Sequence, residues 1–126
     1  MQEYLVEVIC DTSFLIHLAT KRIKNIDSLN MEIGQVSFIV PQVVQNELAK
    51  LIKNPKKNQD ITTTIDFIKN FKILPTTGNF ADKELVDYVK KNHAIIGTMD
   101  KELKKKIKEF GGSVMSFSNN KIILES

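Results

Sequence analysis

Four acidic residues of this chain follow or interrupt apolar segments, where a charge is costly unless something compensates it. They are Asp11, Glu47, Asp82 and Asp100. If the fold brings them together, four carboxylates share one pocket, and like charges at that density either keep protons or hold a cation. Carboxylate oxygens suit Mg²⁺ or Mn²⁺. A metal of that kind in an otherwise basic chain points to phosphodiester chemistry on a nucleic acid.

Two of these acids come directly after short apolar runs. Asp11 follows residues 5–10 and Asp100 follows residues 94–98. Ligands of an open parallel sheet bind outside the carboxyl ends of the strands, so both residues are candidates for one site. A simple helix N-cap explains either residue equally well, because Asp is favoured at that position.

The other two acids lie within helical patterns. Glu47 stands four residues after Val43 and four before Leu51, so it shares a face with an apolar stripe. A buried lysine could compensate that charge, but we favour a role in metal binding. Asp82 precedes Leu85 by three residues and is expected to point with a second buried stripe. It too could be a cap, because it falls in the first helical turn.

Short runs rich in Val, Ile and Leu alternate with segments whose apolar residues recur every three or four positions. The first pattern predicts buried strands and the second predicts helices. The alternation favours an α/β sandwich around a mostly parallel sheet, with the last two strands as an edge hairpin. The expected strands are 5–10, 36–40, 72–74, 94–98, 113–117 and 121–124. The expected helices follow residue 11 and cover 41–52, 61–71, 80–92 and 100–110, and the pair Gly111-Gly112 is expected to end the last of them. A further short helix is expected within residues 24–35, ending near Gly34.

The bulk composition is that of an ordinary soluble domain: 126 residues, of which 42% are hydrophobic and 26% charged. We expect one domain over residues 1–126, because no linker is long enough to separate two. Cys10 is the only cysteine, so no intramolecular disulfide can form. No apolar stretch nears the roughly 20 residues of a membrane span, and residues 1–4 do not resemble a signal peptide. We therefore expect a cytoplasmic protein without membrane contact.

The net charge of +3 hides an asymmetry. Without the four candidate acids, 18 basic residues face 11 acidic ones, a balance of +7. Basic clusters attract phosphate backbones, although a solvated, lysine-rich helix face is the more ordinary source of such clusters. The candidate nucleic-acid contacts are Lys50, Lys53, Lys56, Lys57, Lys101, Lys104 and Lys105.

Four segments resemble, in order and spacing, the motifs of PIN-domain nucleases. They are residues 9–15 (ICDTSFL), 41–48 (PQVVQNEL), 81–86 (ADKELV) and 97–103 (GTMDKEL). The resemblance covers nearly the whole chain, and it implies a three-layer α/β/α fold and metal-dependent endoribonuclease activity with Mg²⁺ or Mn²⁺. It also implies a catalytic and metal-binding quartet supported by two hydroxyl groups. The quartet would be Asp11, Glu47, Asp82 and Asp100, with Ser13 and Thr98 in the supporting positions.

Two subclasses of that family are open at this stage. Residues 11–16 and 111–114 lean towards archaeal single-domain proteins similar to the nuclease that processes small-subunit rRNA. The second subclass is the toxin of a toxin–antitoxin pair. The partners implied are an RNA (an rRNA precursor, mRNA or tRNA), an antitoxin or ribosome-assembly protein, and a second copy of the chain. The cysteine pairs of a zinc ribbon, which some ribosomal PIN nucleases carry, are absent from the sequence.

Other classes of protein also place acids in a pocket of an α/β fold. A phosphoryl-accepting response-regulator domain needs an acidic pair after its first strand, but Thr12 and Ser13 follow Asp11. A phosphatase of the Asp-x-Asp type fails at Ser13 for the same reason. A PIN-like module that binds RNA or protein without cutting stays open, although the presence of all four acids argues against it. His17 and His93 are weak candidates for a general base, because the expected chemistry uses metal-activated water.

Overall fold

The computed structural model describes residues 5–25, 35–53, 58–76, 78 and 80–125. The expected strands and helices are present in these ranges, with ends shifted by a few residues at most, whereas the short helix expected near Gly34 lies outside the described residues. No helix in the described part of the chain has the length and apolarity to cross a membrane. The elements are β1 (Leu5–Cys10), α1 (Thr12–Thr20), β2 (Gln35–Pro41), α3 (Gln42–Leu51), α4 (Asn58–Ile68), β3 (Lys72–Leu74), α5 (Ala81–Lys91), β4 (Ile95–Gly97), α6 (Lys101–Glu109), β5 (Ser113–Ser118) and β6 (Lys121–Glu125).

Six strands of the described chain form one sheet in the order β3–β2–β1–β4–β5–β6. Strands β1 to β5 pair in parallel, and β6 pairs antiparallel with β5 at one edge. The register places Cys10 opposite Gly97, and Gly97 opposite Met115, so the carboxyl ends of β1 and β4 lie together beside the middle of β5. The strand order reverses between β1 and β4, which is the position where ligands bind in open α/β sheets.

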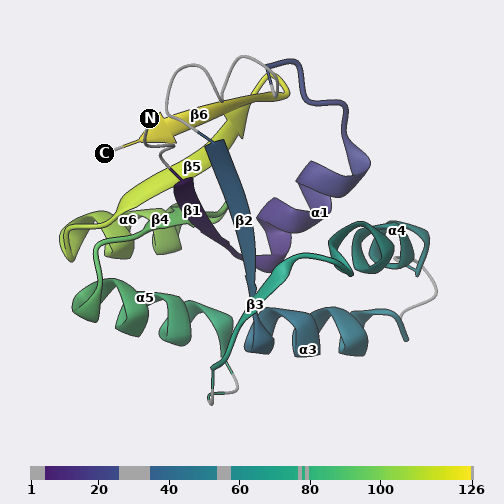
Figure 1. Cartoon of the computed structure of the whole chain (residues 1–126), viewed down its shortest axis with the longest axis horizontal. Coiled ribbons are helices and arrows are strands. Elements are labelled where there is room, and N and C mark those ends of the chain that lie inside the picture. Colours follow the sequence, from purple (N-terminus) through teal and green to yellow (C-terminus); the bar gives the residue numbers. More distant parts are fainter. Residues whose placement is uncertain (1–4, 26–34, 54–57, 77, 79, 126) are drawn as a thin grey trace.

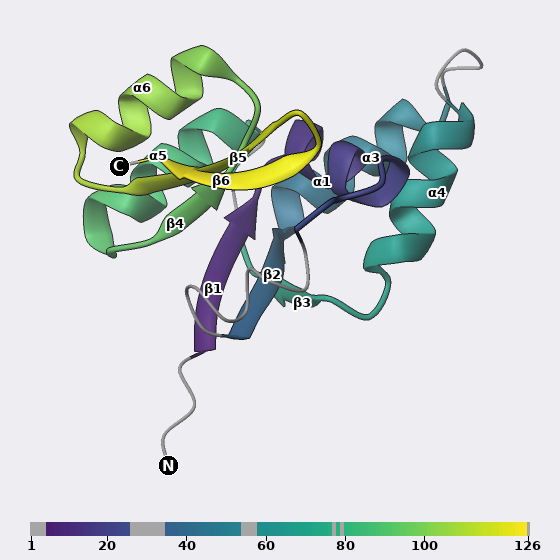
Figure 2. The same cartoon turned by 90° about the horizontal axis from the view of Figure 1, so that it is seen from above.

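Helices cover both faces of the sheet. Helices α1, α3 and α4 lie on one side and α5 and α6 on the other (Figures 1 and 2). Successive side chains of a strand point to opposite faces, so Val8 and Cys10 pack on the α1 side and Ile9 packs on the α5 side. This arrangement confirms the three-layer α/β/α fold. The largest buried helical side chains are Phe14, Leu15 and Leu48, with Ile61, on the first side and Leu85, Leu103 and Ile107 on the second.

Two turns depend on backbone conformations with positive φ. Gly111 (φ 85°) follows α6 and ends it, as the Gly111-Gly112 pair predicted. Asn119 (φ 53°) and Asn120 (φ 60°) form the two-residue turn between β5 and β6. Asn is one of the few residues other than glycine that adopts this conformation readily, so the pair suits a tight hairpin.

A close approach between β4 and α1 sets the geometry at the carboxyl edge of the sheet. A Cβ atom on Gly97 would lie 2.9 Å from the Phe14 ring, so glycine is what lets the strand pass here. Asp11 N donates to Gly97 O (2.8 Å), and Thr98 N donates to Met115 O (3.0 Å). These bonds hold the carboxyl ends of β1 and β4 together and tie them to the middle of β5.

Candidate active site

The four acidic side chains converge on one open cleft at the carboxyl edge of the sheet. Four different helices position them: Asp11 precedes α1, Glu47 lies in α3, Asp82 lies in α5 and Asp100 precedes α6. The sequence pattern singled out all four. The cleft has a volume of about 670 Å³ and is lined by Asp11, Thr12, Ser13, Ile16, Glu47, Leu51, Phe80, Ala81, Asp82, Met99 and Asp100.

Asp11 is the most buried of the four acids, with 6% of its surface exposed. Its pKa is raised from 3.8 to about 6, first by burial and to a smaller extent by the charges of Asp82 and Glu47. Hydrogen bonds from the Thr12 backbone and the Thr98 side chain lower the pKa in part. The carboxylate is therefore mostly charged at neutral pH but poorly solvated, and a nearby cation would stabilise it.

Thr98 connects the first acid to the fourth. Its side chain is fully buried, and Oγ1 donates a hydrogen bond to Asp11 Oδ2 (3.0 Å). The same oxygen accepts a hydrogen bond from Asp100 N (3.1 Å). Nearby, Ser13 Oγ accepts a hydrogen bond from Met99 N (3.3 Å), which ties the β4–α6 connection to the first turn of α1. Both hydroxyl residues thus hold the backbone and side chains around the cleft.

The helix-cap explanation applies to one of the two acids that follow a strand. Asp100 Oδ1 accepts hydrogen bonds from Glu102 N (2.9 Å) and Leu103 N (3.2 Å), so Asp100 caps α6 while it also lines the cleft. Asp11 occupies the equivalent position before α1, but its side chain makes no cap hydrogen bond with the described helix. Its carboxylate is directed to Thr98 and the cleft instead.

Glu47 and Asp82 lie at the surface of the cleft. Glu47 is half-buried, on the cleft side of α3. Asp82 is exposed, so the expectation that it points with the buried stripe of α5 is wrong. The physical reason is that the first turn of α5 borders the cleft, whereas Leu85 packs in the core. The pKa of Asp82 is raised, mainly by desolvation and then by the charge of Asp100, while Lys106 lowers it.

The donor atoms of the cleft fit a hard divalent cation, because the polar side chains that line it present oxygen atoms. One of them is the buried Thr12 Oγ1, which finds no hydrogen-bond partner in the part of the chain that the structure describes. Such an atom is normally paired, so it is available to a ligand of the cleft. Among the described residues, no three His, Cys, Asp or Glu side chains stand close enough to hold one ion together. One or two of the carboxylates would hold such an ion, as is usual for Mg²⁺ in proteins.

Lysines stand near two of the acids that line the cleft, Glu47 and Asp100. Lys50 lines a small pocket together with Glu47, and Lys101 begins α6 directly after Asp100. Lys53 is exposed just beyond the end of α3. Lys50 and Lys101 are therefore the candidate phosphate contacts closest in the chain to the acids.

The remaining candidate lysines differ in how freely they could contact an RNA phosphate. Lys104 is half-buried and forms an ion pair with Glu125 (3.0 Å), so a phosphate would have to compete with that carboxylate. Lys105 is exposed on the same helix. Lys56 and Lys57 lie outside the described residues.

None of the described residues that line the acidic cleft is a histidine. The His17 ring stacks on Phe117 with centroids 4.1 Å apart, and its Nε2 lies 3.2 Å from Asn120 Oδ1. His93 is exposed and lies near Val6 and Ser113, at the amino ends of the strands. Both rings are therefore placed away from the four acids.

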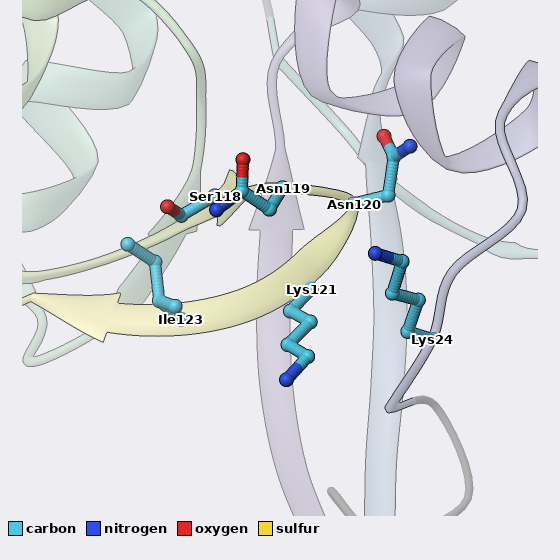
Figure 3. A pocket seen from close by; sticks show the side chains of 6 residues that line it. All are labelled: Lys24, Ser118, Asn119, Asn120, Lys121 and Ile123. Atoms are coloured by element: carbon cyan, nitrogen blue, oxygen red, sulfur yellow. The ribbon is translucent and has the colours of Figure 1, made fainter.

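A second open pocket, of about 550 Å³, lies at the turn between β5 and β6 (Figure 3). The described residues that line it include neither a carboxylate nor a histidine, so this pocket lacks the acidic ligands that the chemistry expected from the sequence needs. The acidic cleft is thus the candidate active site. The residues of the second pocket are Lys24, Ser118, Asn119, Asn120, Lys121 and Ile123.

A family model described as PIN like domain matches residues 8–119 of the chain. The chain belongs to the PIN-like domain family. Ribonuclease VapC4 of Methanocaldococcus jannaschii is 30% identical to this PIN-like domain over 117 residues, which cover 88% of this chain and 89% of that protein. The sequence motifs and the matched family agree, so the resemblance to PIN-domain ribonucleases is confirmed.

Solved structures share the architecture of this PIN-like domain. The structure of the PIN domain endonuclease Utp24 superposes with a TM-score of 0.73 and 28% identity, covering 94% of this chain and 90% of that one. A domain of a functionally unknown protein from Methanocaldococcus jannaschii has a TM-score of 0.50 and 16% identity, covering 90% of this chain and 91% of that one. The second likeness shows the fold alone.

Sequence reasoning missed several residues of the cleft in this PIN-like domain. Thr12 and Phe80 are the two with features of their own, a buried unpartnered hydroxyl and an exposed ring. The sequence could have indicated both residues by their position, because Thr12 directly follows the first acid and Phe80 directly precedes the third motif. The other missed residues are apolar, and an apolar side chain in a motif or a helical stripe does not by itself indicate a place in a cleft; they are Ile16, Leu51, Ala81 and Met99.

Proposed function

We propose that this protein is a metal-dependent endoribonuclease that uses Mg²⁺ or Mn²⁺. Its catalytic and metal-binding residues are Asp11, Glu47, Asp82 and Asp100. The observation that carries this proposal is the convergence of the four acids on one cleft, where burial raises the pKa of Asp11. Membership in the PIN-like domain family supports it, as do relatives named a ribonuclease and a PIN domain endonuclease.

The four acids divide into two pairs in this proposal. Asp11 and Asp100 are the primary metal ligands, while Glu47 and Asp82 bind a second ion or orient water. When bound, the metal supplies Lewis-acid activation of water and offsets charge on the phosphate oxygens. Thr98 keeps the Asp11 carboxylate and the Asp100 backbone in a fixed relation through its two hydrogen bonds.

The lysines next to the acids position the RNA backbone. Contacts to phosphate place a nucleic acid on a protein without reading its sequence. Lys50 and Lys101 are the leading candidates, because Lys50 shares a pocket with Glu47 and Lys101 directly follows Asp100. Lys53 and Lys105 extend these basic surfaces, whereas Lys104 contributes less because it is paired with Glu125.

A cleavage assay tests the proposal. Structured and unstructured RNAs are incubated with Mn²⁺, Mg²⁺ or EDTA and with wild type, Asp11→Asn or Asp66→Asn. Asp66 is a matched control, since its exposed carboxylate lies on α4 and pairs with Lys69. We expect metal-dependent cutting that Asp11→Asn abolishes and Asp66→Asn retains. Cutting by folded Asp11→Asn at the wild-type rate would overturn the residue assignment, and no cutting with any metal would favour a binding module.

The processing role and the toxin role use this same reaction and differ in the RNA and the partner. We propose rRNA processing as the first candidate, because residues 11–16 and 111–114 lean towards that subclass. A single cut by purified wild type in precursor rRNA supports it. The toxin role is supported instead if expression of the protein arrests growth, if this arrest requires Asp11, and if a protein encoded beside the gene relieves it.

A further inference from the structure

Phe80 is the most exposed large hydrophobic residue among those described, with 73% of its surface accessible. It occupies the N-cap position of α5 (φ −122°, ψ 119°), two residues before Asp82, and it lines the acidic cleft. Ser, Thr, Asp and Asn are favoured at an N-cap because their side chains bond the free N–H groups of the helix. A phenyl ring cannot do this, so neither helix capping nor core packing accounts for Phe80.

Two other phenylalanines are also exposed, and each of their rings has a partner. Phe67 is 43% exposed and makes an edge contact with the Phe71 ring, with centroids 5.3 Å apart. Phe110 is 46% exposed and has Lys90 Nζ 4.6 Å from its ring centroid. Within the described ranges, no ring or cation covers Phe80 in this way. The one uncovered ring of the three is thus the one in the cleft.

The cleft is partly apolar, although four carboxylates line it. Ile16, Leu51 and Met99 contribute side chains to the same space as Phe80. A phosphate group gains nothing from apolar carbon atoms, because it needs cations and N–H donors. A nucleobase does gain from them, because it has flat apolar faces that stack on aromatic rings. The lining therefore matches a nucleotide with its base as well as its phosphate.

We propose that Phe80 forms a nucleobase-binding site, on which the base next to the scissile phosphate stacks. The proposal rests on the ribonuclease function proposed above, because its ligand is the RNA substrate. Stacking on Phe80 determines which phosphate lies over Asp11 and Asp100. Every base has a π face, so this contact sets the position of the chain in the cleft without selecting a sequence.

The test measures binding of a fluorescent, unpaired oligoribonucleotide in EDTA, where no metal is present and the RNA stays intact. The proteins are wild type, Phe80→Ala, Phe80→Tyr and the matched control Phe67→Ala. A base stacked on an aromatic ring supports about 5- to 150-fold tighter binding. We expect a loss of that size for Phe80→Ala, binding within about twofold of wild type for Phe80→Tyr, and no change for Phe67→Ala.

A second series of oligoribonucleotides isolates stacking from other effects of the substitution. Each RNA lacks the base at one position near the cut that wild type makes with Mn²⁺. Wild type should bind one of these RNAs more weakly than the intact RNA. Phe80→Ala should bind that RNA and the intact RNA equally, because the missing base and the missing ring belong to one contact and their effects do not add. Unchanged binding by Phe80→Ala, or additive losses at every position, would overturn the nucleobase site while wild-type cleavage left the ribonuclease function intact. A wild type that neither binds nor cuts the RNA would overturn both.

Discussion

Replacing Asp11 by Asn is expected to stabilise the metal-free protein while it abolishes cleavage. Folding buries the Asp11 carboxylate to 6% exposure and raises its pKa from 3.8 to about 6. One pKa unit corresponds to about 1.4 kcal/mol, so at neutral pH the charged side chain lowers the free energy of unfolding by about 3 kcal/mol. Asparagine has no charge to desolvate, and its amide oxygen can still accept the Thr98 hydrogen bond.

The pH dependence of this stabilisation separates charge burial from a change in packing. Between about pH 4 and pH 6, the folded wild type binds a proton at Asp11 that the unfolded chain has released. Wild-type stability therefore falls as the pH rises through this window. The advantage of Asp11→Asn is absent below about pH 4, grows up to about pH 6 and stays constant above it.

Urea denaturation in EDTA, followed by circular dichroism at pH 3.5, 5 and 7.5, measures this difference. With a denaturant dependence of about 1–3 kcal/mol per molar urea, the midpoint of Asp11→Asn should rise by about 1–3 M at pH 7.5. Asp66→Asn, which changes an exposed carboxylate, should stay within about 0.5 kcal/mol of wild type. Equal stability of wild type and Asp11→Asn at pH 7.5, or a gap that persists at pH 3.5, would refute the reasoning.

Three further substitutions test contacts of the cleft and of the edge strand β6. Thr98→Val removes a hydrogen bond to the charged Asp11, worth about 1.5–3 kcal/mol. The pKa of Asp11 should therefore rise, the acid limb of the pH–rate profile should move up by about one to two units, and Thr98→Ser should restore it. Gly97→Ala places a Cβ 2.9 Å from the Phe14 ring and should lower the free energy of unfolding by about 1–3 kcal/mol; an unchanged urea midpoint would contradict this. Glu125→Gln weakens the contacts with Ser116, Lys104 and Lys108 that lower the pKa of Glu125 to about 2. It should cost about 1 kcal/mol at pH 7, and thermal melts should show the difference vanishing as the pH falls from 4.5 towards 2.

Much of the fold could be predicted from local patterns. The apolar run before Asp11 formed β1, and the glycine pair at 111–112 ended α6, because burial and backbone preference within one element depend on neighbouring residues. The alternation of strands and helices was enough to predict a parallel sheet covered on both faces. The end of α4 was less well predicted: the helix stops at Ile68, and a turn occupies the two residues that follow.

The sequence also singled out the four acids of the candidate site, but it did not determine how buried each side chain is or which groups it bonds. Asp11 and Asp100 both follow strands, yet Asp100 caps its helix and Asp11 is buried against Thr98. Asp82 has the spacing of a buried residue and is exposed, because the first turn of its helix borders the cleft. Solvent access near a sheet edge depends on the neighbouring elements, which a single helical pattern does not encode.

Local patterns in the sequence thus specify the elements, the layered fold and the residue types that could bind a metal. Which of these groups meet depends on the packing of the whole chain. The Thr98–Asp11 hydrogen bond joins positions 87 residues apart, the ion pair of Lys104 with Glu125 engages a candidate RNA contact, and Phe80 has its ring uncovered beside the acids. Each of these contacts depends on strand order and register, which arise from packing of the whole chain and leave no periodic trace in the sequence near any one residue.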